Sequence, residues 1–226
     1  MLSMLLSGNF SVSGVIIYML SSLAVIFLTL PVHEFAHGWT AVKLGDPTPR
    51  YQGRLTLNPF AHIDYLGAAC ILLVGFGWAR PVQINAGNFK NPKGGMAITA
   101  LAGPVSNLIV SLITLILYYL FTFLMGVTEV FALFYIAYFF YWIAYINVSL
   151  AVFNLIPIPP LDGSRLLSAL LPYKQYYALM RYERYIFYGL LVLLWFGVLD
   201  KPLGFLTSAV MNFLQNIAYL PFSLIG

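Results

Sequence analysis

The sequence predicts an all-α polytopic membrane protein with four to six transmembrane helices and one short re-entrant or β segment. First, 61% of its residues are hydrophobic and only 8% are charged, whereas a soluble globular domain carries about 25% charged residues. Second, several apolar runs approach the roughly 20 residues that a helix needs to cross a bilayer. We therefore expect the lipid bilayer to surround the chain, and we expect no nucleic-acid partner.

Residues 11–44 are expected to form the first helix, which carries the motif described below. At 1.5 Å per residue this helix is roughly 50 Å long, and because the hydrocarbon core is only about 30 Å thick, the helix must tilt or project. Pro31 removes a hydrogen bond to the carbonyl of Phe27 and therefore predicts a kink. Gly45 and Pro47 mark its end.

The next apolar run, within residues 64–85, is too short to cross a bilayer. Its apolar part has about 14 residues and contains Gly75 and Gly77. Residues 80–85 then alternate polar and apolar side chains, which is typical of an extended strand. We interpret the two glycines as substrate-binding positions, where an unwound substrate adds as a further strand. A helical hairpin packed under the first span remains the alternative.

The rest of the chain continues the same single domain, residues 1–226. Further spans are expected at 95–123, 126–153 and 181–199, and the apolar segment 203–221 either spans or lies along the surface. Basic residues flank the end of the third span and the start of the fourth, whereas the connection between the second and third holds only Glu129. The positive-inside rule therefore places the basic loops in the cytoplasm.

The first helix contains His33, Glu34 and His37. Histidines at positions i and i+4 lie one above the other on a helix face, close enough to share one zinc ion. Glu34 lies about 100° around the helix from His33, so it suits a general base better than a ligand. Because ionisable side chains inside a membrane are costly and commonly functional, the motif predicts a zinc peptidase centre within the membrane.

A catalytic zinc ion usually has three protein ligands and one open position for water. The chain has three histidines and seven acidic residues, so few candidates exist for the third ligand. His62 and Asp64 lie in a polar loop, where solvated roles are expected. Asp162 follows the apolar, proline-rich end of the third span, which lies on the same side of the membrane as His37. This position favours Asp162 as the third metal ligand. The alternative is that Asp162 is an ordinary turn residue in Leu-Asp-Gly.

These residues carry a family resemblance. The motif at 33–37, together with Asn154-x-x-Pro157-x-Pro159-Pro160-Leu161-Asp162-Gly163 and Ala102-Gly103-Pro104-x-x-Asn107, resembles the site-2 protease family of intramembrane zinc metalloproteases. The likeness is to its compact prokaryotic branch, without PDZ or CBS domains. It implies one Zn²⁺ per chain held by His33, His37 and Asp162, with Glu34 as general base. It also implies membrane-spanning protein substrates and a prokaryotic inner or plasma membrane. The positive-inside rule places the centre toward the cytoplasmic side.

The resulting hypothesis is a zinc-dependent intramembrane endopeptidase that serves regulated proteolysis or peptide clearance. Asn154 is the candidate to hold the substrate backbone or the oxyanion, and Asn107 is a second candidate with a helix–helix hydrogen bond as its alternative. The competing functions are a metal transporter and an inactive, protease-like scaffold. A peptidase with a downstream helical glutamate as third ligand is a further alternative, for which only Glu129 and Glu183 are available.

Overall fold

The structure of the protein is a computed structural model that describes residues 11–74 and 78–223, and these residues contain helices and no strand. The helices, in chain order, are α2 (Val12–Ala24), η1 (Val25–Thr29), α3 (Leu30–Lys43), α4 (Thr48–Tyr51), η2 (Pro59–Ala61), α5 (Tyr65–Val74), η3 (Ala86–Asn88), α6 (Pro92–Thr128), α7 (Ala132–Asn154), α8 (Asp162–Leu170), α9 (Tyr173–Arg181), α10 (Glu183–Trp195) and α11 (Asp200–Ser223). The all-α membrane fold expected from the sequence is confirmed.

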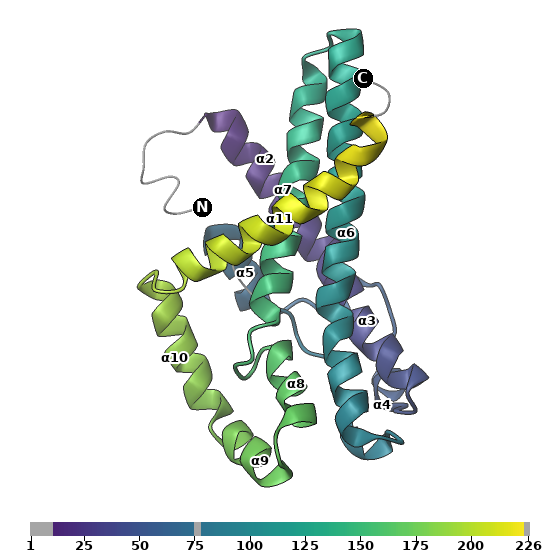
Figure 1. Ribbon diagram of the computed structural model, residues 1–226, viewed down its shortest axis with the longest axis vertical. Helices are drawn as coiled ribbons and strands as arrows, with labels where there is room; N and C mark the ends of the chain where they lie inside the picture. Colours follow the sequence, from purple (N-terminus) through teal and green to yellow (C-terminus); the bar gives the residue numbers. More distant parts are fainter. Residues whose placement is uncertain (1–10, 75–77, 224–226) are drawn as a thin grey trace.

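Helices α6 and α7 form a long antiparallel hairpin at the centre of the molecule, and α11 crosses it (Figure 1). Leu115, Ala144 and Val148 are buried where these helices meet. The Ser111 hydroxyl donates to the carbonyl of Ala144 at 2.9 Å, which ties the two helices together where lipid offers no hydrogen-bond partner. The hairpin corresponds to the spans expected at 95–123 and 126–153, and both helices are long and apolar enough to cross a membrane.

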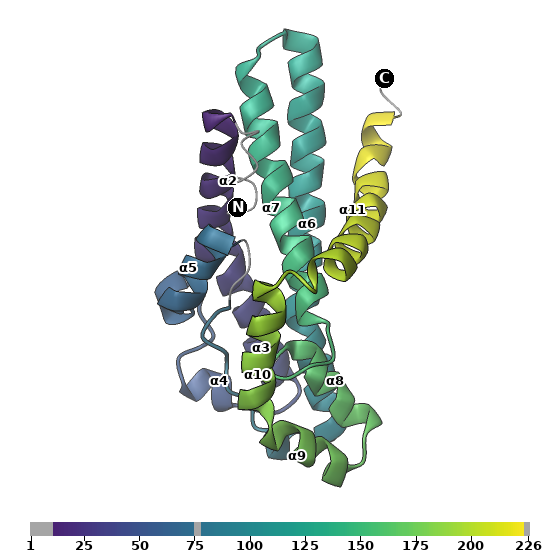
Figure 2. The same cartoon turned by 90° about the vertical axis from the view of Figure 1, so that its left-hand side faces the viewer.

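The first span runs through α2, η1 and α3 without a break, from Val12 to Lys43. It lies along the hairpin on the side opposite α11 (Figure 2). The five residues of η1 form a π-helical turn directly before Pro31. Because proline lacks an N–H and its ring crowds the preceding turn, a locally widened turn accommodates it. The structure thus has a π-helical turn shortly before Pro31 within one continuous helix, and the expected kink stays a prediction.

Between α4 and α6, the described residues contain no helix long enough to cross a membrane. Helix α5 has 10 residues, or about 15 Å at 1.5 Å per residue, which is half of a hydrocarbon core. Residues 78–85 form no strand, contrary to the expectation for 80–85. The reason is that the N–H groups of Val82 and Asn85 donate to the carboxylates of Glu34 and Asp46, rather than to another strand.

The expected span 181–199 is shorter than a membrane crossing, because α10 ends at Trp195. Gly197 has a φ of +67°, a left-handed conformation that glycine adopts without strain. After this turn α11 continues in a direction 85° from α10, and the two helices meet the combined length and apolarity criteria for a span only together. The described residues therefore contain three helices that are both long and apolar enough to cross a membrane, or four spans if this bent pair counts as one.

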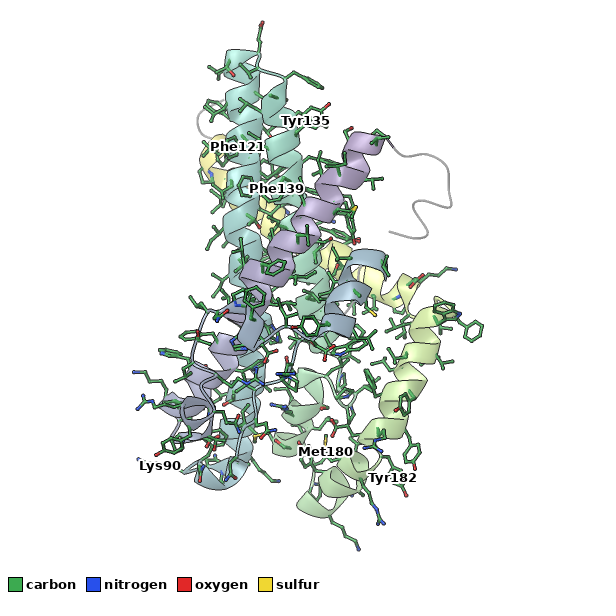
Figure 3. The ribbon with its side chains drawn as sticks, turned by 180° about the vertical axis from the view of Figure 1, so that it is seen from behind. Lys90, Phe121, Tyr135, Phe139, Met180 and Tyr182 are labelled. Atoms are coloured by element: carbon green, nitrogen blue, oxygen red, sulfur yellow. The ribbon has the colours of Figure 1, made fainter. Side chains whose placement is uncertain are left out.

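Polar elements gather at one end of the molecule. Helices α4, α8 and α9 lie at the lower end in Figure 1, and the α6–α7 turn lies at the upper end. Figure 3 shows Lys90 and Tyr182 near the lower end, with Phe121 and Tyr135 in the upper half. The basic loops of the sequence therefore share one end, which agrees with the single-sided distribution expected from the positive-inside rule.

Candidate metal centre

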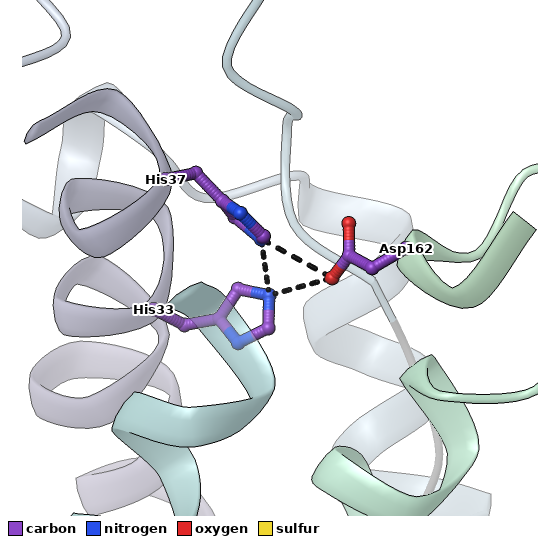
Figure 4. Close-up of side chains that lie close together, drawn as sticks. All are labelled: His33, His37 and Asp162. Atoms are coloured by element: carbon purple, nitrogen blue, oxygen red, sulfur yellow. Dashed lines mark hydrogen bonds and ion pairs between the residues drawn. The ribbon is translucent and has the colours of Figure 1, made fainter. Parts of the chain in front are cut away.

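Three side chains from two distant parts of the chain converge on one point. His33 and His37 project from α3, and Asp162 is the first residue of α8 (Figure 4). The Nε2 atoms of the two histidines are 3.1 Å apart, and Oδ2 of Asp162 lies 3.3 Å from His33 Nε2 and 3.1 Å from His37 Nε2. Both histidines are 4% exposed. The i, i+4 spacing thus places both imidazoles on one helix face, as the sequence predicts.

The triangle fits a zinc ion. Zinc bonds to imidazole nitrogen and carboxylate oxygen are 2.0–2.2 Å long, and a tetrahedron with such bonds has edges of about 3.4 Å. The observed separations of 3.1–3.3 Å are close to this value. Two imidazoles, one carboxylate and one open position are also the donor set of a catalytic zinc site. These three residues are therefore positioned to bind one metal ion.

Helix α6 packs against the imidazoles. Nδ1 of His37 donates to the backbone carbonyl of Thr99 at 2.7 Å, which leaves the unprotonated Nε2 directed at the metal position. One turn further, Gly103 lies against both rings, and a Cβ atom there would overlap His37 Nε2 and His33 Cε1. Gly103 therefore provides the space in which the two imidazoles meet.

The start of α8 determines where Asp162 lies. A Cβ at Gly163 would overlap the carbonyl oxygens of Leu155 and Ile156, so this glycine lets α8 begin close to the end of α7. The Asp162 carboxyl group therefore lies within 3.3 Å of both imidazole Nε2 atoms, and its ionised form is the one that binds a metal.

Glu34 lies next to this triangle but outside it. Its side chain is 7% exposed, and Oε2 accepts a hydrogen bond from the N–H of Val82 at 3.1 Å. Glu34 also lines the cavity of about 700 Å³ that contains the two histidines and Asp162. A carboxylate in this position can exchange protons with a molecule in the cavity.

Segment 78–88, which carries the Val82 N–H, is fixed by Asp46. The Asp46 side chain is fully buried and accepts hydrogen bonds from Asn85 N at 2.7 Å, Asn88 Nδ2 at 2.7 Å and the N–H and hydroxyl of Thr48. Burial opposes ionisation of Asp46, but these hydrogen bonds outweigh burial and lower the pKa of its carboxyl. The sequence suggested only that Asp46 follows the end of a helix.

The expected substrate-binding residues fall in different places. Asn154, at the end of α7, lines the cavity, whereas Asn107 is buried in α6 and is not part of the cavity wall. The Nδ2 group of Asn107 has no hydrogen-bond partner among the described residues. Gly75 and Gly77 lie outside the described residues.

His62 and Asp64, the other candidates for the third metal ligand, make hydrogen bonds to the backbone instead. His62 is fully buried, rather than solvated, with Nε2 2.9 Å from the carbonyl of Thr56. Asp64 accepts from the N–H groups of Leu66 and Gly67 at the start of α5. Neither side chain belongs to the metal-ligand group found among the described residues.

Comparison with known proteins identifies the family. The model of Peptidase family M50 matches residues 128–197. A relative from Bacillus subtilis, named "Putative zinc metalloprotease YwhC", is 43% identical over 160 residues, which cover 69% of this chain and 73% of the relative. The chain belongs to peptidase family M50. "Putative zinc metalloprotease Rip2" of Mycolicibacterium smegmatis is 31% identical over 149 residues, 60% of this chain and 51% of that relative. No solved structure matches significantly.

As an M50 peptidase with two imidazoles and one carboxylate around a single metal position, the chain is a zinc metalloendopeptidase. Its cavity includes groups that the sequence did not single out. They are the Val82 N–H that binds Glu34, and three arginines from α8, α9 and the start of α10, namely Arg165, Arg181 and Arg184. The sequence could not indicate the Val82 N–H, because almost every residue has a backbone N–H.

Proposed function

We propose that this M50 peptidase cleaves membrane-spanning segments of protein substrates, with His33, His37 and Asp162 as zinc ligands and Glu34 as the general base. The observation that carries the proposal is the position of His33, Glu34 and His37 within a continuous helix, Val12–Lys43, that is long and apolar enough to cross a membrane. A buried ionisable cluster is retained at such a position only where it has a function.

The chain's own residues account for the proton transfers. A zinc ion in this site would polarise the scissile carbonyl and lower the pKa of the attacking water toward neutrality. Glu34 takes a proton from that water and returns it to the leaving amine. Its Oε2 is held by the Val82 N–H, so the carboxylate keeps one orientation while the other oxygen exchanges protons.

Asn154 supplies an uncharged donor beside the reacting atoms, since it lines the same cavity as Glu34. Its amide can bind the substrate backbone or the oxyanion that develops during attack. The segment between α7 and α8 contains three prolines at 157, 159 and 160 and no helix, and its Pro160 and Leu161 line the cavity, so non-helical backbone borders the site. A locally unwound substrate requires such partners.

We further propose a location and orientation. The chain lies in a prokaryotic inner or plasma membrane, as one domain over residues 1–226, with the centre toward the cytoplasmic side. Arg50, Arg165 and Lys174 lie on α4, α8 and α9, which share one end of the molecule, and the positive-inside rule assigns this end to the cytoplasm.

The test uses the zinc-loaded full chain in lipid vesicles with a single-span peptide as substrate. The expected result is hydrolysis of a bond within the apolar span, located by mass spectrometry of the products. Removal of zinc by a chelator should stop the reaction, and restored zinc should recover it. Cleavage only in the flanks outside the apolar span would contradict the intramembrane assignment.

A further inference from the structure

One wall of the cavity is basic. Arg165 of α8, Arg181 at the end of α9 and Arg184 near the start of α10 line the same cavity as Glu34 and Asn154. Arg165 lies one helical turn beyond Asp162 and therefore on the same face of α8. The arginines come from three successive helices and line the same cavity. We call Arg165, Arg181 and Arg184 the arginine rim.

The guanidinium groups of the arginine rim have no partner in the part of the chain that the structure describes. The ion pairs in the described part of the chain all join His33 or His37 to Asp162. None of the three guanidinium groups takes part in a hydrogen bond or ion pair with described residues. Glu183 also lines the cavity, but it lies beyond ion-pair distance of its neighbours Arg181 and Arg184. Apart from Glu34 and Asp162, the cavity wall thus carries three positive charges and one negative charge.

Unpaired guanidiniums beside a partly enclosed cavity attract anions. Arginine presents planar donors that bind a carboxylate through two parallel hydrogen bonds, and cavity walls of low dielectric constant strengthen such an interaction. Because the rim and the metal centre line one cavity of about 700 Å³, a peptide bound there can place a carboxylate at the rim and a peptide bond beside Glu34.

The position of the rim favours a peptide over a lipid headgroup as the occupant. In Figure 3, Met180 lies on the α8 side of the turn between α9 and α10, and Tyr182 lies on the outer side. Met180 lines the cavity with the arginine rim, whereas Tyr182 is 57% exposed and does not. Lys174 of α9 also lies outside the cavity wall and is exposed. Arg181 and Arg184 are themselves exposed, and the exposed ring of Tyr185 lines the cavity beside them. The rim differs from Lys174 in that it shares a cavity with Glu34 and Asn154, where the substrate peptide must lie.

We infer that the arginine rim binds a carboxylate-bearing flank of the substrate, so that the enzyme prefers membrane segments followed or preceded by acidic residues on the α9 side of the membrane. This inference rests on the proposed function, because the acidic flank and the scissile bond must belong to one chain. It makes the three arginines specificity-determining residues, separate from the zinc ligands and the general base.

The experiment compares three single-span peptides that differ only in one flank, which carries aspartates, asparagines or lysines. The value of kcat/KM is measured for the zinc-loaded chain in phosphatidylcholine vesicles, with the flank on either end in turn. One charged hydrogen-bonded contact corresponds to about a tenfold preference, so the aspartate peptide should exceed the asparagine peptide by about tenfold. This preference should shrink between about 50 mM and about 500 mM salt.

Variants assign the preference to the rim. In Arg181→Gln/Arg184→Gln the ratio of kcat/KM for the aspartate and asparagine peptides should fall toward one. In Arg181→Glu/Arg184→Glu the lysine peptide should become the best of the three, a reversal that misfolding cannot produce. Lys174→Gln is the matched control, since it removes a cation from α9 outside the cavity wall, and it should keep the wild-type ratio.

Equal cleavage of all three peptides by the wild-type chain would overturn the assignment of the rim and leave the proposed function intact. If no peptide is cleaved, the proposed function fails, and the inference fails with it. A second outcome would also overturn the inference. In it, the cleavage rate does not depend on the flank but increases with the phosphatidylglycerol content of the vesicles, and only when Arg181 and Arg184 are present. This result would show that the guanidiniums bind lipid headgroups.

Discussion

The two sides of the cavity differ in how many of their side chains are buried and packed against neighbouring helices. On the α3 side, His33, Glu34 and His37 are buried, and α6 lies directly behind them. On the opposite side, Leu190 is the one fully buried residue among the described side chains of α10. Helix α10 reaches the segment after α5 through an edge-to-face contact between Trp78 and Phe187, with ring centroids 5.6 Å apart.

This difference separates two tasks. Metal ligands and a general base must be held within a fraction of an ångström, which requires locked side chains supported by their neighbours. A cavity wall through which a polypeptide enters must be able to move. Helices with few buried side chains can move away from the core at a low cost in free energy. We therefore expect substitutions on the α3 side to affect chemistry and metal binding, and substitutions on the α9–α10 side to affect which substrates enter.

The largest effect is expected for Glu34→Gln. The amide cannot accept a proton, so activity should fall by about 10²–10⁴-fold, the usual contribution of a general base. Zinc content should stay at the wild-type level, because Glu34 lies outside the ligand triangle. Hydrolysis of the single-span peptide and metal analysis of the same preparation check both statements. Substantial cleavage by this variant would remove Glu34 from the mechanism.

Gly103→Ala tests the support behind the imidazoles. The added Cβ would overlap both rings, and disturbance of the groups that orient metal ligands lowers metal affinity by about 10–100-fold. Gly126→Ala is the matched control, because it lies on the same helix with no atom within 4 Å of the added Cβ. Competition with a zinc chelator measures the affinity of each variant. Equal affinities would mean that α6 does not constrain the ligands.

Asp46→Asn should have a smaller effect on activity. An asparagine cannot replace every hydrogen bond that the carboxylate accepts, so segment 78–88 and the Val82 N–H are held less firmly. The expected loss in kcat is about fivefold, equivalent to one hydrogen bond of about 1 kcal/mol. Asp64→Asn, which alters a carboxylate remote from this contact, is the control.

The same variant has a signature in the pH dependence of stability. The pKa of Asp46 is lowered in the folded chain, so its carboxylate stabilises the fold above the ordinary pKa of aspartic acid, about 3.9. That contribution is lost as the pH falls through the lowered pKa. Thermal unfolding between about pH 6 and about pH 3 should therefore show a smaller loss of stability in Asp46→Asn than in wild type. An identical loss would contradict the role given to this carboxylate.

The sequence was sufficient to predict the α3 side and much less of the α9–α10 side. Helical spacing alone places His33 and His37 on one face, and apolar length alone predicts the spans that became α6 and α7. The break after Trp195 was missed, although Gly197 signals a possible turn. Residues 80–85 were expected as a strand because alternation is typical of strands, yet their N–H groups bind Glu34 and Asp46. Such contacts between distant residues have no periodicity in the sequence.

The central claim, that α3 and α8 together hold a zinc ion, is tested most directly by the zinc content of Asp162→Ala. Asp64→Ala is its matched control, because that aspartate contacts the start of α5 and lies outside the ligand triangle. Both purified proteins are dialysed against the same zinc buffer and analysed by inductively coupled plasma mass spectrometry. The account predicts about one zinc per chain for Asp64→Ala, as for wild type, and far less for Asp162→Ala, which retains two of three ligands. Full zinc in Asp162→Ala with loss from Asp64→Ala would contradict it.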